Sequence, residues 1–282
     1  MHIFLTGGTG FIGSNLIKLA LDQKHEITAI KRNAESKPRI VLTKQPKWIT
    51  KKFSALNKND FDESEILIHL AAHSANFPYD TLENCLKVNV FDTLKIFNLA
   101  YEAGIRKFVM TGSCFEYGKK GEDYEYIPPD CSLFPTQSYP TSKAAASIVL
   151  TQWALEKEVS LKILRLFQVY GDGELKTRLW PTLKEKAING LDFKMTKGAQ
   201  IRDFIKVQDV GNIIIKEAED VKNNKILIKN IGSGKPRKLS DFVLEAWKKF
   251  DAKGKIEFGY FPYRQNEVMR FVPDTVNEYI VR

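Results

Sequence analysis

Short apolar runs alternate with longer helical patterns over the first two-thirds of the chain. The apolar runs predict strands at residues 2–6, 26–30, 66–70, 106–110 and 161–167. Apolar residues at helical spacing predict helices between them, at residues 11–22, 84–103 and 138–157. Strands that alternate with helices of this length predict a parallel sheet covered by helices on both faces.

The pattern changes after Tyr170, where Gly171-Asp172-Gly173 interrupts the chain and Pro181 opens a further helix. Later elements are predicted as a strand at 201–207, a helix at 208–220, a strand at 225–231 and a helix at 241–250 with Ser240 as its N-cap. We therefore expect one large domain over residues 1–170, to which segments at about 201–231 return. A smaller interleaved region mainly occupies residues 171–282.

Composition places the chain among ordinary globular proteins. It has 282 residues, 43% hydrophobic and 27% charged. No apolar run approaches the roughly 20 residues of a membrane span, and the first strand is too short for a signal peptide. Three cysteines without paired spacing favour a reducing compartment, so we expect a cytoplasmic protein without disulfides. We expect no metal site, since only His69 and His73 have ligand spacing and a predicted strand end separates them.

The formal net charge of +9 suggests an anionic ligand. Lys and Arg are spread along the chain, and no basic stripe is interleaved with aromatic residues. Because the basic residues are dispersed, we expect no nucleic-acid partner. The positive net charge is also compatible with a phosphorylated small molecule.

A glycine-rich turn, Gly7-Gly8-Thr9-Gly10-Phe11-Ile12-Gly13, follows the first predicted strand directly and leads into a helix. Such a turn lets the backbone approach a pyrophosphate and places the free N–H groups of a helix N-terminus against it. The spacing differs from the usual Gly-x-Gly-x-x-Gly, and a purely structural turn would use the same glycines. The strand–turn–helix context favours a dinucleotide site formed by Gly7, Thr9, Gly10, Phe11 and Ile12.

The second predicted strand ends in Lys31-Arg32. An NAD site usually has Asp or Glu there, about 20 residues past the glycines, to bind the ribose hydroxyls. Two cations instead suit the 2′-phosphate of NADP. We expect NADP(H), with NAD(H) as the alternative if both side chains face solvent.

Three residues could transfer a proton beside that cofactor. Tyr139 and Lys143 stand four positions apart in a predicted helix and so share one face, and Ser113 follows a predicted strand. Hydride reduction of a ketone produces an alkoxide that must be protonated. A tyrosine has an unperturbed pKa of about 10, which a neighbouring ammonium lowers. Ser113 would hold the substrate oxygen.

With these residues the chain resembles the extended short-chain dehydrogenase/reductases, also called NAD-dependent epimerase/dehydratases, over nearly its whole length. The motifs that carry the resemblance are Thr6–Gly13, His69-Leu70-Ala71-Ala72, Asn89-Val90, Thr111-Gly112-Ser113 with Tyr117-Gly118, Tyr139-x-x-x-Lys143, Val169-Tyr170-Gly171, Arg202-Asp203-Phe204 with Val207 and Asp209, and Asn230–Gly234.

The resemblance implies a Rossmann-type doubly wound α/β fold with a smaller α/β region for a nucleotide-diphosphate sugar. It implies that Ser113, Tyr139 and Lys143 are catalytic, that Lys143 also holds the nicotinamide ribose, and that two helices per subunit form a homodimer, here 84–103 and 138–157. Further cofactor residues are then Leu70, Ala71, Ala72 and Asn89, and candidate substrate residues are His73, Gln168, Arg202 and Arg264. The alternative for the two arginines is an intramolecular ion pair, of Arg202 with Asp203 or Asp209 and of Arg264 with Glu267. The alternative for His73 is a packed or solvated side chain.

Departures from the family's sequence pattern reduce the number of reactions that we expect this chain to catalyse. The related 4,6-dehydratases follow their Ser/Thr with Asp-Glu, where this chain has Cys114-Phe115. Related epimerases that act beside the keto group use a Cys at the position of Phe115, together with a His. Glu116 could reach the site, although a surface carboxylate is the more common case.

Later segments resemble bacterial CDP- and dTDP-4-keto-6-deoxyhexose reductases of the CDP-abequose synthase type. These segments are Val169–Glu174, Gly198–Ile205 and Arg264–Met269. We expect an NADPH-dependent nucleotide-sugar 4-ketoreductase. The alternatives are a 4-epimerase with tightly bound NAD and an NADP-binding sensor or scaffold without catalysis.

Overall fold

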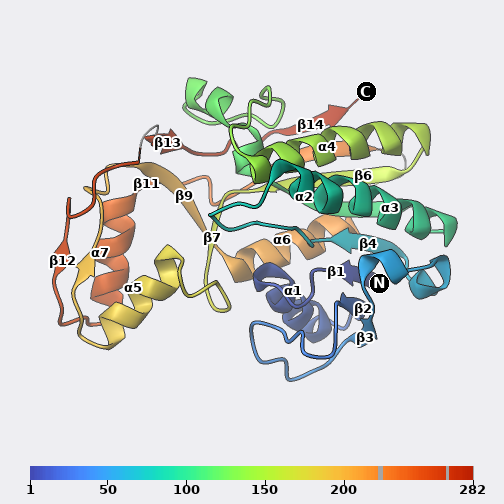
Figure 1. Ribbon diagram of the computed structural model, residues 1–282, viewed down its shortest axis with the longest axis horizontal. Helices are drawn as coiled ribbons and strands as arrows, with labels where there is room; N and C mark the ends of the chain where they lie inside the picture. The colour runs from blue at the N-terminus through green and yellow to red at the C-terminus, as the bar shows by residue number, and fades with distance from the viewer. Residues whose placement is uncertain (222–224, 265–266, 282) are drawn as a thin grey trace.

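The computed structural model describes residues 1–221, 225–264 and 267–281. Its main sheet has the strand order β14-β10-β6-β5-β4-β1-β2-β3, and every neighbouring pair is parallel except β10 and β14 (Figure 1). The bounds of these strands are β1 His2–Thr6, β2 Glu26–Lys31, β3 Lys47–Thr50, β4 Ile66–His69, β5 Lys107–Ser113, β6 Ser160–Leu166, β10 Ile226–Ile231 and β14 Glu278–Val281. The chain winds outward in both directions from β1, which is the expected doubly wound arrangement.

Helices cover both faces of this sheet, α1 and α6 on one and α2, α3 and α4 on the other (Figure 1). The helices of the described chain are α1 Phe11–Asp22, α2 Leu82–Leu86, α3 Thr93–Glu102, α4 Ser138–Glu156, α5 Leu179–Ile188, α6 Val207–Glu219 and α7 Leu239–Lys249. A π-helical segment, η3 (Lys87–Asp92), joins α2 to α3. Short 3₁₀ turns are η1 Phe53–Ala55, η2 Lys58–Phe61, η4 Cys114–Glu116 and η5 Lys119–Asp123.

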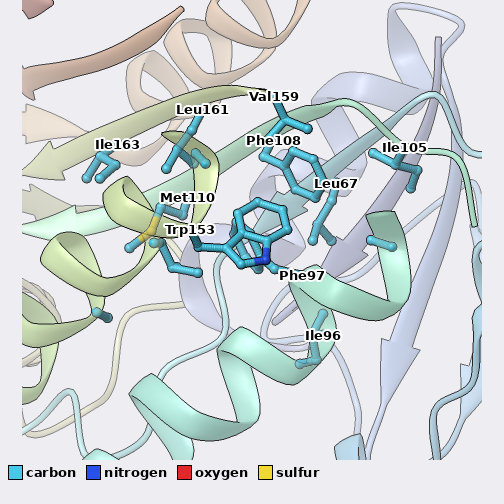
Figure 2. Close-up of a cluster of buried hydrophobic side chains, with 14 of the residues drawn as sticks. Leu67, Ile96, Phe97, Ile105, Phe108, Met110, Trp153, Val159, Leu161 and Ile163 are labelled. Carbon is cyan, nitrogen blue, oxygen red and sulfur yellow. The ribbon is translucent and has the colours of Figure 1, made fainter. Parts of the chain in front are cut away.

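Each face of the sheet has its own hydrophobic core. On the α3/α4 face, Trp153 packs edge-on against Phe97 and Phe108, with ring centroids 5.4 and 5.0 Å apart (Figure 2). Leu16 and Ile17 of α1 meet Ile214 of α6 on the other face. Because the strands are buried on both sides, their sequences are apolar almost throughout.

A smaller region lies beyond one edge of the α/β layers (Figure 1). Its four-stranded sheet consists of β7 (Gln168–Tyr170), β9 (Ile201–Lys206), β11 (Pro236–Lys238) and β13 (Arg270–Phe271). Two further strands, β8 (Phe193–Lys194) and β12 (Ile256–Glu257), pair with each other. Helices α5 and α7 pack together through Leu183, Phe242 and Trp247.

Several sequence predictions match these elements, and two need correction. The predicted helix at 84–103 is interrupted by η3, and Ser240 is not the N-cap of α7, which begins at Leu239 with Lys238 at the N-cap position. The strand predicted at 201–207 is β9, which belongs to the smaller sheet, whereas α6 and β10 pack in the main layers. No helix in the described ranges is long and apolar enough to cross a membrane.

Candidate active site

A cleft of about 1090 Å³ opens at the carboxyl ends of the parallel strands. It is lined by the glycine turn, the segments that follow β2, β4 and β5, the strand β7 and the first turns of α4. In a doubly wound sheet this edge is where ligands bind, because the crossover connections diverge there.

The glycine turn is shaped to hold a close ligand. Gly7 has φ of +76°, and a Cβ added there would lie 2.7 Å from the Ala71 nitrogen. A Cβ on Gly13 would overlap the Gly7 carbonyl. The N-terminus of α1 therefore lies directly behind the turn, with Gly10 as its N-cap. All five predicted residues of this turn line the cleft: Gly7, Thr9, Gly10, Phe11 and Ile12. This geometry fits a dinucleotide pyrophosphate.

The segment after β4 forms the adjacent wall. Leu70, Ala71, Ala72 and His73 line the cleft, whereas Asn89 is buried behind them in η3. The Asn89 amide accepts from the His73 backbone N–H at 2.7 Å and donates to the His73 carbonyl and to Ser142 Oγ. Asn89 thus holds the wall against α4 and does not face the cleft.

Cations gather where the cleft passes β2. Lys31 and Arg32 line it, as do Arg39, Lys51 and Lys52, which the sequence analysis did not single out. Lys31 Nζ lies 5.8 Å from the centroid of the Trp48 ring, and Lys51 pairs with Asp60 at 2.6 Å. Within the described residues, Arg32, Arg39 and Lys52 have no carboxylate partner.

Ser113, Tyr139 and Lys143 all line the cleft. Lys143 is buried and donates from Nζ to the Thr111 carbonyl at 2.7 Å, and burial lowers its pKa. Burial and then the charge of Glu116 raise the pKa of Tyr139, whereas a hydrogen bond with Ser113 lowers it. The Tyr139 ring packs against Tyr79, with centroids 5.4 Å apart. The net result is a raised pKa for Tyr139, in contrast to the lowering expected from Lys143.

Comparison with known proteins decides the family. A model of the NAD dependent epimerase/dehydratase family matches residues 3–232. The chain belongs to this family.

Individual relatives within the family are distant. UDP-arabinose 4-epimerase 1 of Arabidopsis thaliana is 26% identical over 97% of this chain and 72% of that protein. CDP-abequose synthase of Salmonella muenchen is 27% identical over 95% of this chain and 87% of that protein. As a member of the epimerase/dehydratase family, the chain is an NAD(P)-dependent enzyme of the extended short-chain dehydrogenase/reductase type.

Solved structures of two nucleotide-sugar enzymes share the fold. A UDP-N-acetylglucosamine 4-epimerase from Methanobrevibacter ruminantium M1 has a TM-score of 0.86 at 20% identity, covering 98% of this chain and 89% of that one. The NAD-dependent NDP-hexosamine 5,6-dehydratase TunA has a TM-score of 0.83 at 26% identity, with the same coverage.

The predicted substrate residues of this family member divide into two groups. His73 and Gln168 line the cleft, and His73 Nε2 lies 2.7 Å from Asp80 Oδ2. Arg202 and Arg264 are not part of the lining. Arg202 pairs with Glu267 at 3.1 Å and also donates to the Val268 carbonyl. Arg264 is exposed, with its guanidinium 5.7 Å from the Phe77 ring centroid.

Arg178 lines the cleft although the sequence analysis did not select it. Its guanidinium lies 3.4 Å from Glu174. Burial raises the pKa values of Tyr79 and Cys114, and the positive charge of Arg178 partly offsets this rise. It begins α5 at the N-cap position, just before Pro181. The sequence signal that could have identified Arg178 is its position just ahead of the helix that follows β7.

The two residues after Ser113, Cys114 and Phe115, provide no base that could remove a proton from a carbon atom. Burial raises the pKa of Cys114 to about 12, so its thiol is neutral near pH 7. Phe115 faces the cleft with an apolar ring. Glu116, expected more often at the surface, is fully buried and forms an ion pair with Arg165 at 2.9 Å. The spacing Ser113-x-x-Glu116 is a capping-box signature and could have indicated this inward direction.

Proposed function

We propose that the protein is an NADPH-dependent 4-ketoreductase that acts on a nucleotide-activated 4-keto-6-deoxyhexose, in the formation of deoxysugars for surface polysaccharide. The observation that carries the proposal is the cationic end of the cleft beyond β2. Arg32, Arg39 and Lys52 line it without a carboxylate partner among the described residues. Such a site stabilises the 2′-phosphate that distinguishes NADPH, the form a reductase consumes.

The catalytic residues support the proton half of a ketone reduction. The cofactor, when bound, supplies a hydride to C4 of the sugar. Ser113 donates a hydrogen bond to the C4 oxygen, and Tyr139 protonates that oxygen as negative charge develops. Lys143, fixed by the Thr111 carbonyl, provides the positive charge that stabilises the phenolate left behind. A raised tyrosine pKa suits a residue that must carry its proton into the reaction.

Dehydration and epimerisation beside the ketone have weaker support. Both need a base that removes a proton from carbon. The two positions after Ser113 supply a neutral thiol and a phenyl ring in place of such a base. Simple reduction at C4 requires no carbon base.

A nucleotide-diphosphate sugar fits the other half of the cleft. Arg178 lines this half, and its planar guanidinium matches phosphate oxygens. Gln168 and His73 would contact the sugar. In this proposal Arg202 exchanges Glu267 for a phosphate oxygen, and Arg264 approaches from the exposed rim above Phe77.

A 4-epimerase that retains NAD is the second candidate. It uses the same three catalytic residues, and the relatives named UDP-arabinose 4-epimerase favour it. A sensor or scaffold without catalysis has less support, since it has no use for Ser113, Tyr139 and Lys143 meeting in one cleft.

We also infer a homodimer. Phe91 of η3 and Ile148 of α4 are 67% and 62% exposed, and they lie on adjacent helical elements. Large apolar side chains on neighbouring helices are typical of a subunit interface. The division into a cofactor domain and a sugar-binding region, and the cytoplasmic location, stay predictions.

The test is a substrate panel. Purified protein is mixed with NADPH or NADH and the CDP-, dTDP-, GDP- or UDP-4-keto-6-deoxyhexose, and loss of the reduced cofactor is followed. The proposal expects NADPH to be oxidised with at least one of these sugars and NADH to be a poorer donor. Protein that arrives with tightly bound NAD, and interconverts a UDP-sugar without added cofactor, identifies the 4-epimerase instead.

A further inference from the structure

Glu116 is a fully buried carboxylate directly behind the catalytic residues. Its Oε1 accepts from the Ser113 backbone N–H at 2.7 Å. Its Oε2 accepts from Ser147 Oγ at 2.7 Å and from Arg165 Nε at 2.9 Å. A buried carboxylate needs this many partners because its desolvation is costly.

These partners come from the elements that carry the catalytic groups. Ser113 ends β5, and Ser147 lies one helical turn after Lys143 in α4. Arg165 lies in β6, where it pairs with Gly112 across the sheet. One carboxylate therefore ties together the strand end that presents Ser113 and the helix that presents Tyr139 and Lys143.

The residues around the Glu116–Arg165 ion pair leave space for it and supply further hydrogen bonds. A Cβ on Gly112 would lie 2.7 Å from Glu116 Oε1 and 2.9 Å from Arg165 Cγ, so a glycine is required there. Arg165 is itself held by Tyr117 Oη at 3.0 Å and the Pro129 carbonyl at 2.9 Å. Tyr117 then donates to Asn230 at 2.6 Å, which extends the network to the end of β10.

We propose that Glu116 is a positioning residue, which through Arg165 and Ser147 fixes Ser113 against the Tyr139–Lys143 face of α4. The proposal rests on the proposed function, since it concerns the geometry of that same proton transfer. Small displacements of reacting groups reduce rates strongly, so a fixed spacing between these elements has a direct effect on kcat.

The charge of Glu116 also acts on the pair that it positions. Burial raises the pKa of Tyr139 and the Glu116 charge adds to this rise, whereas burial lowers the pKa of Lys143 and the Glu116 charge partly offsets that lowering. Among the described residues, other titratable groups that interact with the pair include Tyr79 from the loop before α2, Cys114 from η4 and His69 from β4. Removing a negative charge favours the deprotonated forms. The limb of the pH–rate profile that reflects the titration of Tyr139 and Lys143 therefore moves to lower pH when Glu116 is neutralised.

Glu116→Gln tests the inference because it keeps the side-chain volume and removes the charge. We expect kcat to fall about 10- to 100-fold, the affinity for NADPH to change less than about twofold, and the pH–rate limb to shift to lower pH. Ser147→Ala removes only the link to α4 and should lower kcat by about threefold, with little loss of stability.

Glu217→Gln is the matched control. Glu217 forms a largely buried ion pair with Lys162 at 2.7 Å, between α6 and β6, and a second ion pair with Lys229 at 2.8 Å. This variant should lose comparable stability yet keep kcat and the pH profile. The double variant Glu116→Leu with Arg165→Met replaces the ion pair by apolar groups, which restores stability in other proteins. It should fold and still have low kcat.

Wild-type kcat and pH profile in Glu116→Gln, or wild-type kcat in the double variant, overturns the inference. If Glu116→Gln does not fold, the double variant and Ser147→Ala decide. Failure of the reductase proposal looks different, because the wild-type chain then oxidises no NADPH with any keto sugar. The same variants are in that case compared by their interconversion of a UDP-sugar.

Discussion

Tyr139 is the side chain on which proton transfer depends in the proposed reaction. Tyr139→Phe keeps the ring contact with Tyr79 and removes only the hydroxyl. We expect kcat to fall about 10²- to 10⁴-fold, the usual contribution of a general acid, with NADPH affinity nearly unchanged. Steady-state turnover and a cofactor titration measure both quantities. Tyr101→Phe, at a tyrosine that packs on Trp153 away from the cleft, is the control. Survival of turnover in Tyr139→Phe would show that another group donates the proton.

Lys31 and Arg32 should determine the choice of cofactor. Replacing both with Ala removes two cations from the end of the cleft. Hydrogen bonds to charged groups contribute about 1.5–3 kcal/mol, so the KM for NADPH should rise roughly 10- to 100-fold. The KM for NADH should barely change, as should both values in the surface control Lys253→Ala. An equal rise for both cofactors would reject the assignment of these cations to the 2′-phosphate.

The sequence indicated the residues that act locally but not those placed by long-range packing. The glycine turn and the Tyr139–Lys143 pair follow from spacing along the chain. Glu116 can form a buried ion pair only because the fold places Arg165, on the neighbouring strand β6, beside it. Arg39 and Lys52 likewise reach the cofactor end of the cleft through loops whose paths a sequence pattern does not give.

The glycine turn between β1 and α1 must stay free of side chains. Gly7 and Gly190 both have positive φ, +76° and +65°, but only Gly7 has backbone atoms close to where a Cβ would be. Ala at either position should cost about 1–2 kcal/mol in backbone strain. Gly7→Ala should lose further stability and bind NADPH at least about tenfold more weakly, because the turn must move away from Ala71. Denaturant unfolding and cofactor titration compare the two variants. Equal cofactor affinity in both would mean that the close approach at Gly7 is not needed for binding.

Among the elements, long periodic segments were predictable and short ones were not. Helix α1 begins and ends where the apolar spacing placed it, at Phe11 and Asp22. The strands β7, β8, β12 and β13 have two or three residues each, too few for an alternation to be recognised. The π-helical segment η3 turns Asn89 inward to hold the backbone of His73, a tertiary constraint that interrupts an otherwise regular helical pattern.

For the whole molecule, the exposed apolar residues on η3 and α4 predict how two copies associate. Phe91→Glu or Ile148→Glu places a charge in the proposed interface and should convert the dimer to a monomer. Ile188→Glu on α5 is a matched control, because Ile188 is 62% exposed, as is Ile148, but lies in the smaller region. Sedimentation velocity distinguishes the two states. A wild-type monomer, or a dimer that survives both charged variants, would exclude this interface.

The most direct test of the central claim follows the hydride itself. NADPH that carries deuterium in its transferable position is incubated with the protein and a nucleotide 4-keto-6-deoxyhexose, and the product sugar is examined by NMR and mass spectrometry. A 4-ketoreductase places one deuterium at C4 for each NADPH oxidised. An unlabelled sugar formed without loss of NADPH, as from an epimerase that recycles its own bound NAD, would contradict the proposed function.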